Sequence, residues 1–387
     1  TYDSLRADPR PIIHFGYSQF VPSIIAPGFT DRLRLVAELS ILGNGFTYSV
    51  PGFAGGQFLL DGGEHFWSVS AQSGTHQVSL QADLSHLPTG QYNYLLSSAV
   101  RLFVRNNLTG ATNFNVGEIL HVNTIDSAFG SGWGLAGLQE IVENPDGSVL
   151  LIDGDGSELL FERPAALEGA YQGPPGDFST FESLADGTYR RTLKDQTVYQ
   201  FNESGQLASV TDPDGNQTRY LYNELGLLVS IIDPVDLETT FAYEGDRIFR
   251  ITDPAGRVTQ LEYDPNGNLI QIKDPDLSER TFEYDEKRHL TAEIDHRGYR
   301  EETVYDFAGR ATRAVRKDGS IVQIRPVEVE GLYSPEQTIN PFQPPLAQNL
   351  LETPTASYAD AMVMWYLPNL MQMVKRFQLV MEGDPYL

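Results

Sequence analysis

Residues 253–275 read DPAGRVTQLEYDPNGNLIQIKDP, and variants of this stretch recur along the chain. A tyrosine marks each copy at steps of 21, 20, 21 and 21 residues: Tyr222, Tyr243, Tyr263, Tyr284 and Tyr305. An Asp-Pro pair keeps the same spacing at Asp212, Asp233, Asp253 and Asp274, and the fifth copy is degenerate, Asp295-His296. Two markers with one common period indicate a tandem array, in which a small supersecondary unit stacks on copies of itself.

One copy of the repeat has the pattern of a β-hairpin. Every second residue from Thr259 to Tyr263 belongs to one face, which is the period of a strand. The run Asp264-Pro-Asn-Gly267 follows and has the composition of a tight turn, since Pro presets one dihedral and Gly accepts a positive φ. Asn268 to Lys273 then forms a return strand. We expect each tyrosine ring to cover the neighbouring strand with its hydroxyl in water, as a packing residue; ligand stacking is the alternative.

The repeat resembles the YD-repeat (Rhs) family. Asp212-Pro-Asp-Gly-Asn-Gln-Thr218 and Asp253-Pro-Ala-Gly-Arg-Val-Thr259 match the family's pattern closely, and the segment Asn123 to Leu138 is similar to the stretch that leads into such arrays. The resemblance covers about residues 116 to 325. It implies a spiral β-sheet of the kind that forms a hollow shell in Rhs and Tc-type toxins and in teneurins. Because this array is short and lacks the motif that closes a toxin shell, we expect a curved sheet or partial wall.

The composition argues against several classes of partner. A net charge of −25 disfavours nucleic acid, whose phosphates need basic patches, and anionic membrane surfaces. The chain has no cysteine, so disulfides and thiol catalysis are excluded. It starts at Thr1 without a recognisable signal peptide, so we expect that an export signal has been removed and that the chain is a piece of a longer one. The predicted location is extracellular or at the cell surface.

The predicted fold class is mainly β, in five segments. Residues 1–115 show alternating strands such as Arg32 to Leu42 and predict an immunoglobulin-like β-sandwich. Residues 116–185 lead into the array, with Trp133 in a glycine-rich stretch predicted to plug one end of the sheet. Residues 186–325 form the curved, antiparallel YD-repeat sheet, and residues 326–356 are a Pro-rich linker or strap.

Residues 357–387 contain all five methionines and predict an apolar helix, kinked at Pro368. A helix that is apolar on all sides requires burial. Three surroundings are open: the repeat sheet, which the helix would plug; a partner subunit, since Met-rich surfaces adapt to partners; and a membrane, which the polar residues in the run disfavour. The assembly or plug residues are Met362, Met364, Trp365, Met371, Met373 and Phe377.

No catalytic constellation and no cofactor site is recognisable in the sequence. The histidines lack metal-ligand spacing, and His289 and His296 are predicted to lie on the surface. Asp153-Gly-Asp155 and Asp212-Pro-Asp214 resemble fragments of calcium loops, but neither has the distant glutamate of an EF-hand, so plain turns are the favoured interpretation.

The predicted function is therefore a non-catalytic scaffold of a secreted or cell-surface bacterial protein. Such a scaffold can self-associate, or join other subunits, into a filament or surface layer, because free sheet edges pair with other strands. One alternative is a fragment of an Rhs- or Tc-like shell that encloses a toxin. Another is a carbohydrate-binding adhesin in which exposed tyrosines stack on glycan rings.

Overall fold

The computed structural model describes residues 1–19, 33–43, 46–49, 66–68, 74–102, 107–108, 113–164, 169–306, 309–326, 332–333 and 377–381. Over these residues the chain is almost entirely β-strand, and nearly all strand pairs are antiparallel. The one α-helix among them is the short α1 (Ser4–Ala7). The prediction of a mainly antiparallel β fold is confirmed.

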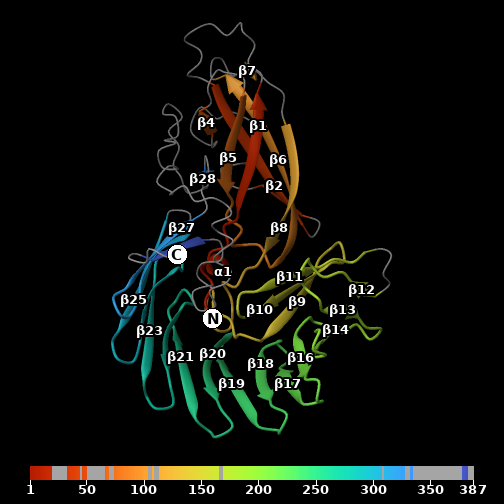
Figure 1. Ribbon diagram of the computed structural model, residues 1–387, viewed down its shortest axis with the longest axis vertical. Coiled ribbons are helices and arrows are strands. Elements are labelled where there is room, and N and C mark those ends of the chain that lie inside the picture. Colours follow the sequence, from red (N-terminus) through yellow and green to blue (C-terminus); the bar gives the residue numbers. More distant parts are fainter. Residues whose placement is uncertain are drawn as a thin grey trace.

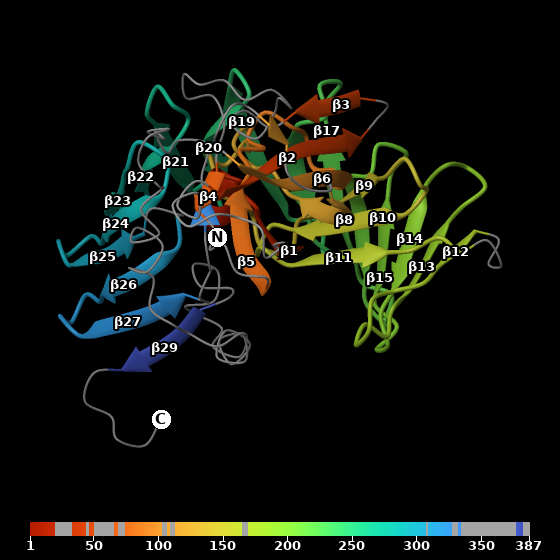
Figure 2. The same ribbon diagram turned by 90° about the horizontal axis from the view of Figure 1, so that it is seen from above.

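The repeats form one 17-stranded sheet in which neighbouring strands follow one another in the chain from β12 to β27, with β29 added at the end. Its strands are β12 (Ala170–Tyr171), β13 (Thr180–Ser183), β14 (Tyr189–Thr192), β15 (Val198–Phe201), β16 (Leu207–Thr211), β17 (Gln217–Tyr222), β18 (Leu228–Ile232), β19 (Glu238–Glu244), β20 (Arg247–Thr252), β21 (Val258–Tyr263), β22 (Leu269–Lys273), β23 (Glu279–Tyr284), β24 (Leu290–Ile294), β25 (Arg300–Tyr305), β26 (Ala311–Val315), β27 (Ile321–Pro326) and β29 (Phe377–Met381). The sheet bends around α1 and the N-terminus (Figure 1), and the view from above shows it wrapping around the centre of the molecule (Figure 2).

A β-bulge recurs at every repeat tyrosine. In β21, Glu262 pairs with Gln271 and Tyr263 pairs with Leu269, so Ile270 is the extra residue. The same register shift precedes the other four repeat tyrosines. A bulge bends its strand and increases the local twist. Its repetition at a fixed period provides a physical cause for the steady curvature of the sheet.

The turns explain the Asp-Pro and Tyr-Asp markers. Asp264 Oδ1 accepts hydrogen bonds from the amides of Asn266 (2.8 Å) and Asn268 (2.9 Å). The amide of Gly267 donates to the Asp264 carbonyl at 3.0 Å, and Gly267 has φ +81°. The turn therefore requires an acceptor side chain at its first position and favours glycine at its fourth. Asp253 accepts from Ala255 and Arg257 in the same way.

Two further sheets lie above the repeat sheet in Figure 1 and share one hydrophobic core. One contains β1 (Ile12–Gln19), β5 (Gly74–Gln81) and β28 (Leu332–Tyr333). The other contains β2 (Leu33–Gly43), β3 (Phe46–Ser49), β4 (Phe66–Ser68), β6 (Gly90–Leu102), β7 (Asn107–Leu108) and β8 (Asn113–His121). Phe15 and Leu80 from the first sheet meet Leu35, Leu39 and Leu96 from the second. The immunoglobulin-like topology itself stays a prediction.

The entry segment supplies a three-stranded sheet that packs inside the curve. It consists of β9 (Gln139–Glu143), β10 (Val149–Asp153) and β11 (Glu158–Phe161). Ile141 and Leu151 pack with Phe201 and Leu207 of the repeat sheet. The Ile141 amide also donates to the carbonyl of Gly205 at 2.8 Å. The repeat sheet thus gains a second layer where it begins.

Three sequence-based predictions need correction. The predicted helix is wrong for residues 377–381, because Phe377–Met381 pairs with β27 as a strand; Met362, Met364, Trp365, Met371 and Met373 lie outside the described residues.

The array's sheet begins at Ala170 rather than at residue 186, because degenerate hairpins without the tyrosine marker already join the ladder. The first segment is not confined to residues 1–115: β8 continues to His121, and the first eight residues pack on the repeat sheet.

Gly205 offers a test of the docking between β9 and the array. It has φ +80°, and a methyl group there would overlap the carbonyl oxygen of Ile141. Gly215 has φ +87° with no atom within 4 Å of the same position, so it is a matched control. Gly215→Ala should lower the free energy of unfolding by about 1 kcal/mol through backbone strain alone. Gly205→Ala should lower it by a further ~1 to 3 kcal/mol through overlap, measured by urea denaturation. Equal losses in the two variants would show that β9 does not dock there.

Candidate functional site

The five repeat tyrosines form a ladder of identical hydrogen bonds on the concave face of the sheet. Each hydroxyl donates to the backbone carbonyl of the residue 15 positions earlier in the chain. The pairs are Tyr222 to Leu207 (3.0 Å), Tyr243 to Leu228 (2.7 Å), Tyr263 to Ile248 (2.7 Å), Tyr284 to Leu269 (2.7 Å) and Tyr305 to Leu290 (3.0 Å). In the neighbouring hairpin, each accepting residue immediately precedes a bulge residue. The hydrogen bond therefore ties one repeat to the next at the point where the strand ladder is interrupted.

These hydroxyls are not in water, so that part of the prediction is wrong. Burial raises the pKa of Tyr243 to about 12. Burial likewise raises the pKa of the other four, Tyr222, Tyr263, Tyr284 and Tyr305, further above the ordinary value of 10.0. All five are therefore protonated donors at neutral pH. The sequence pattern located the rings correctly at strand ends but gave no signal for the carbonyl partner.

The N-terminal residues insert into this ladder, which the sequence analysis missed. The Tyr2 hydroxyl donates to the Arg288 carbonyl at 2.5 Å and accepts from the Leu290 amide at 3.0 Å. Its ring lies 5.6 Å from that of Trp133 and 6.1 Å from that of Tyr284. Tyr2 is 5% exposed, so these two hydrogen bonds satisfy backbone groups that water does not reach.

Trp133 sits on the inner face of the ladder. Its indole Nε1 donates to the Tyr284 hydroxyl at 2.8 Å, and its ring meets Phe282 edge-on at 4.9 Å. Tyr284 therefore accepts from Trp133 while donating to Leu269. The glycine-rich stretch around Trp133 is needed for this approach, because Gly132 has φ +78° and lies against Tyr2 and Ala7.

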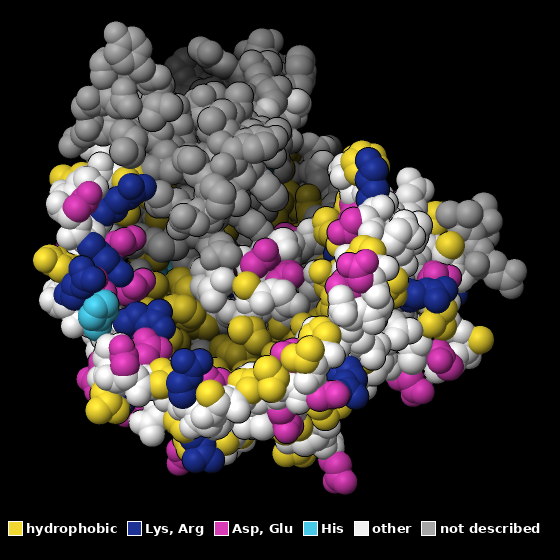
Figure 3. Space-filling view, turned by 60° about the horizontal axis from the view of Figure 1, so that its bottom comes forward, with side chains coloured by type: hydrophobic (Ala, Val, Ile, Leu, Met, Phe, Trp, Pro, Cys, Tyr) yellow, Lys and Arg dark blue, Asp and Glu magenta, His cyan; other side chains and the backbone are white. Residues whose placement is uncertain are grey.

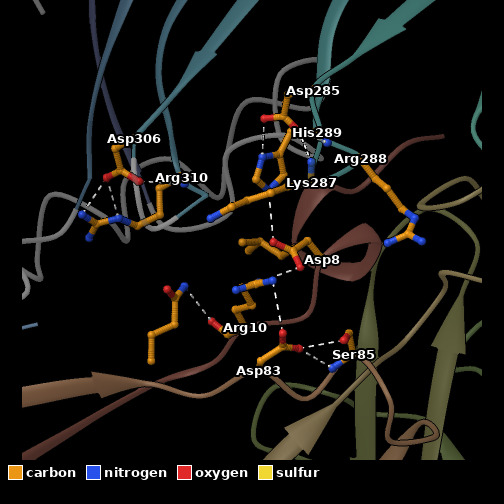
Figure 4. A network of polar contacts seen from close by, with 12 residues as sticks. Asp8, Arg10, Asp83, Ser85, Asp285, Lys287, Arg288, His289, Asp306 and Arg310 are labelled. Atoms are coloured by element: carbon orange, nitrogen blue, oxygen red, sulfur yellow. Dashed lines mark hydrogen bonds and ion pairs between the residues drawn. The ribbon is translucent and has the colours of Figure 1, made fainter. Parts of the chain in front are cut away.

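A buried ionic network joins the N-terminal segment to the array (Figure 4). His289 lies between Asp285 (Nδ1 to Oδ2, 2.9 Å) and Asp8 (Nε2 to Oδ2, 3.6 Å), and its ring stacks on Tyr305 at 4.7 Å. Arg10 then links Asp8 to Asp83, two residues after the end of β5, at 2.7 and 3.2 Å. The prediction of a surface position is wrong for His289, which is 2% exposed, because the N-terminal segment covers it. His296 is exposed as predicted.

A cavity lies between the N-terminal segment, the entry segment and the repeat sheet. Its volume is about 490 Å³. Aromatic residues Phe129, Trp133, Tyr222 and Tyr243 line it together with Glu140 of β9. The Glu140 side chain reaches solvent in the cavity, yet the surrounding protein raises the pKa of its carboxyl, and the charge of Arg6 offsets this in part. Figure 3 shows the hollow within the curved sheet, with many hydrophobic side chains along its walls.

Two of the calcium candidates, Asp153 and Asp212, accept hydrogen bonds within turns. Asp153 Oδ1 accepts from the amides of Gly137 and Asp155, and its Oδ2 accepts from Gln139. Asp212 accepts from the amides of Asp214 and Asn216. Among the described residues no group of three or more His, Cys, Asp or Glu side chains could hold a metal ion. In the same part of the chain, no helix has the length and apolar character needed to cross a membrane.

The comparison with known families agrees with the repeat geometry. Residues 190–339, which are less than half of the chain, match the family model described as Teneurin YD-shell. The array is a YD-repeat array. The resemblance inferred from the Tyr and Asp-Pro markers is thereby confirmed for this region.

The chain also has partial similarity to solved structures. The chain is similar to a Tc holotoxin pore structure from Photorhabdus luminescens (14% identity, TM-score 0.30), covering 67% of this chain and 16% of that one. It is also similar to a TcdB2-TccC3 crystal structure (14% identity, TM-score 0.29), with coverage of 67% and 17%. The chain thus spans less than a fifth of either protein. No curated protein matches it in sequence.

The tyrosine ladder of the YD-repeat array can be tested by comparing two tyrosines with different numbers of partners. Tyr243→Phe removes one hydroxyl bond and should cost about 1 kcal/mol of unfolding free energy. Tyr284→Phe also removes the acceptor of Trp133 and should cost ~2 to 3 kcal/mol, by urea denaturation.

A double-mutant cycle isolates the Trp133 contribution. Combining Tyr284→Phe with Trp133→Phe should give a coupling of about 1 kcal/mol, whereas Tyr243→Phe with Trp133→Phe should be additive. Equal costs for the two tyrosines and no coupling would contradict the geometry described here.

Proposed function

We propose that the chain is a wall section of a hollow β-shell, with a structural rather than a catalytic role. The observation that carries the proposal is the YD-repeat sheet itself, which curves continuously and buries its repeat tyrosines on the concave side. The family match to a YD-shell supports the same conclusion. Of the functions that the sequence leaves open, the toxin-type shell therefore fits better than a fibre.

The two faces of the sheet differ as expected for a wall. The convex face exposes Leu221 and Val304 among charged residues, including a two-bond ion pair from Arg300 to Glu283 at 2.6 and 2.8 Å. The concave face carries the tyrosines, Phe241 and Phe282. Because the repeat tyrosines pack inside the curve, they do not form the exposed platform that a glycan-binding adhesin would need.

We infer that the wall is completed by other segments or subunits and that the protein acts outside the cell. β29 is the last strand of the repeat sheet and, among the described residues, pairs only with β27, so its other side is an edge that another strand can extend. The N-terminal sheets, which we interpret as an immunoglobulin-like sandwich, stand over one opening of the curve (Figure 1). In this arrangement they would act as a lid on the wall.

The shell and the filament hypotheses predict different particles for the purified chain. A wall section should give curved or ring-shaped particles of defined mass in negative-stain microscopy. Its mass by light scattering should stay constant when the protein concentration rises tenfold, because closed assemblies have fixed stoichiometry. Fibres that lengthen with concentration would contradict the shell and support the scaffold hypothesis.

A further inference from the structure

The cavity beneath the N-terminal segment contains one carboxylate that the fold does not use. Among the described residues, no hydrogen bond or ion pair reaches the side chain of Glu140, and its electrostatic neighbours are Arg6 and Tyr222. Its backbone is fixed, because Glu140 forms a β-bridge with Gln206 of the repeat sheet. The side chain is therefore held at the cavity wall without a structural partner.

Arg6 does not neutralise this carboxylate. Its guanidinium bonds the carbonyl of Gly156 at 2.9 Å and pairs with Glu158 at 3.3 Å and with Asp3 at 3.5 Å. Four acidic side chains line the cavity (Asp3, Asp126, Glu140 and Asp153), against two cationic groups, the Arg6 guanidinium and the N-terminal ammonium of Thr1, so acidic groups are in excess. A cleft with one sign of charge concentrates ions of the opposite sign.

The rest of the lining distinguishes between kinds of cation. A calcium ion takes six to eight oxygen ligands, and no cluster of three suitable side chains exists among the described residues. Four aromatic side chains, Phe129, Trp133, Tyr222 and Tyr243, share the cavity with Glu140 instead. Aromatic rings with a nearby carboxylate attract an ammonium group through cation–π contact and charge. The volume of about 490 Å³ lies in the range of small-molecule sites.

We propose that this cavity binds an organic ammonium ion, with Glu140 as its counter-ion and the surrounding aromatic rings as its walls. The carboxylate supplies the charge and one or two acceptor oxygens. The rings exclude water from the alkyl part of the ligand. Both the array and the entry segment contribute to the site, so it exists only when the sheet has closed around the N-terminal residues.

A pair of matched probes tests the proposal on the unmodified 387-residue chain. 1,5-Diaminopentane carries the ammonium groups, and 1,5-pentanediol has the same length without charge. Titration calorimetry at pH 8 should show saturable binding of the diamine and none of the diol. Equal binding of the two, or no binding of the diamine, would overturn the proposal.

Two variants of β9 then assign the site. Glu140→Gln removes the charge with little change of shape and should weaken diamine binding at least about tenfold, the loss expected for a charged hydrogen bond. Glu143→Gln is the control: it lies on the same strand, bonds Tyr189, and should bind as the unmodified chain does. Circular dichroism confirms that each variant is folded. Unchanged affinity in folded Glu140→Gln would show that the diamine binds elsewhere.

Discussion

The hydrogen bond from each repeat tyrosine to a carbonyl 15 residues earlier is the constraint on which the array depends. It requires a tyrosine at one strand end, a bulge in the neighbouring hairpin and a nearly fixed number of residues between them. Most repeats have two five-residue turns that begin at an Asp or Asn; the exception is the β19–β20 hairpin, whose two-residue turn Gly245-Asp246 goes with the one tyrosine step of 20 residues. The period near 21 residues is thus a consequence of geometry, and stability accumulates between neighbouring repeats.

The concave face of this array is shared with the N-terminus. Tyr2 satisfies the backbone at Arg288 and Leu290, and Asp8 meets His289 beside it. The entry segment adds Trp133 and the β9–β11 sheet to the same face. The N-terminal segment and the entry segment therefore fill part of the space inside the curved sheet. Glu140 lines the cavity that they leave open.

The local features could be predicted from the sequence, whereas the long-range ones could not. Alternation around Leu261, the Asp264-Pro-Asn-Gly267 turn and the tyrosine spacing are encoded within a few residues. The Tyr2 contacts join residues 288 positions apart, and nothing in the first ten residues has a period that would indicate them. His289 was misplaced for the same reason, since its cover comes from Asp8. Phe377–Met381 is a strand because β27 offers an edge, which outweighs local helical preference.

The central claim is that buried tyrosine hydroxyls hold the repeats together, and alkaline titration tests it most directly. A folded-state pKa above 10 contributes stability that is complete below pH 10 and is lost as the pH rises through the folded-state values, about 12 for Tyr243 and higher for its neighbours. Tyrosinate absorbance at 295 nm and far-UV circular dichroism should therefore change together in one cooperative step above pH 10. Ionisation of all 19 tyrosines near pH 10 with an intact β-sheet spectrum would contradict the account.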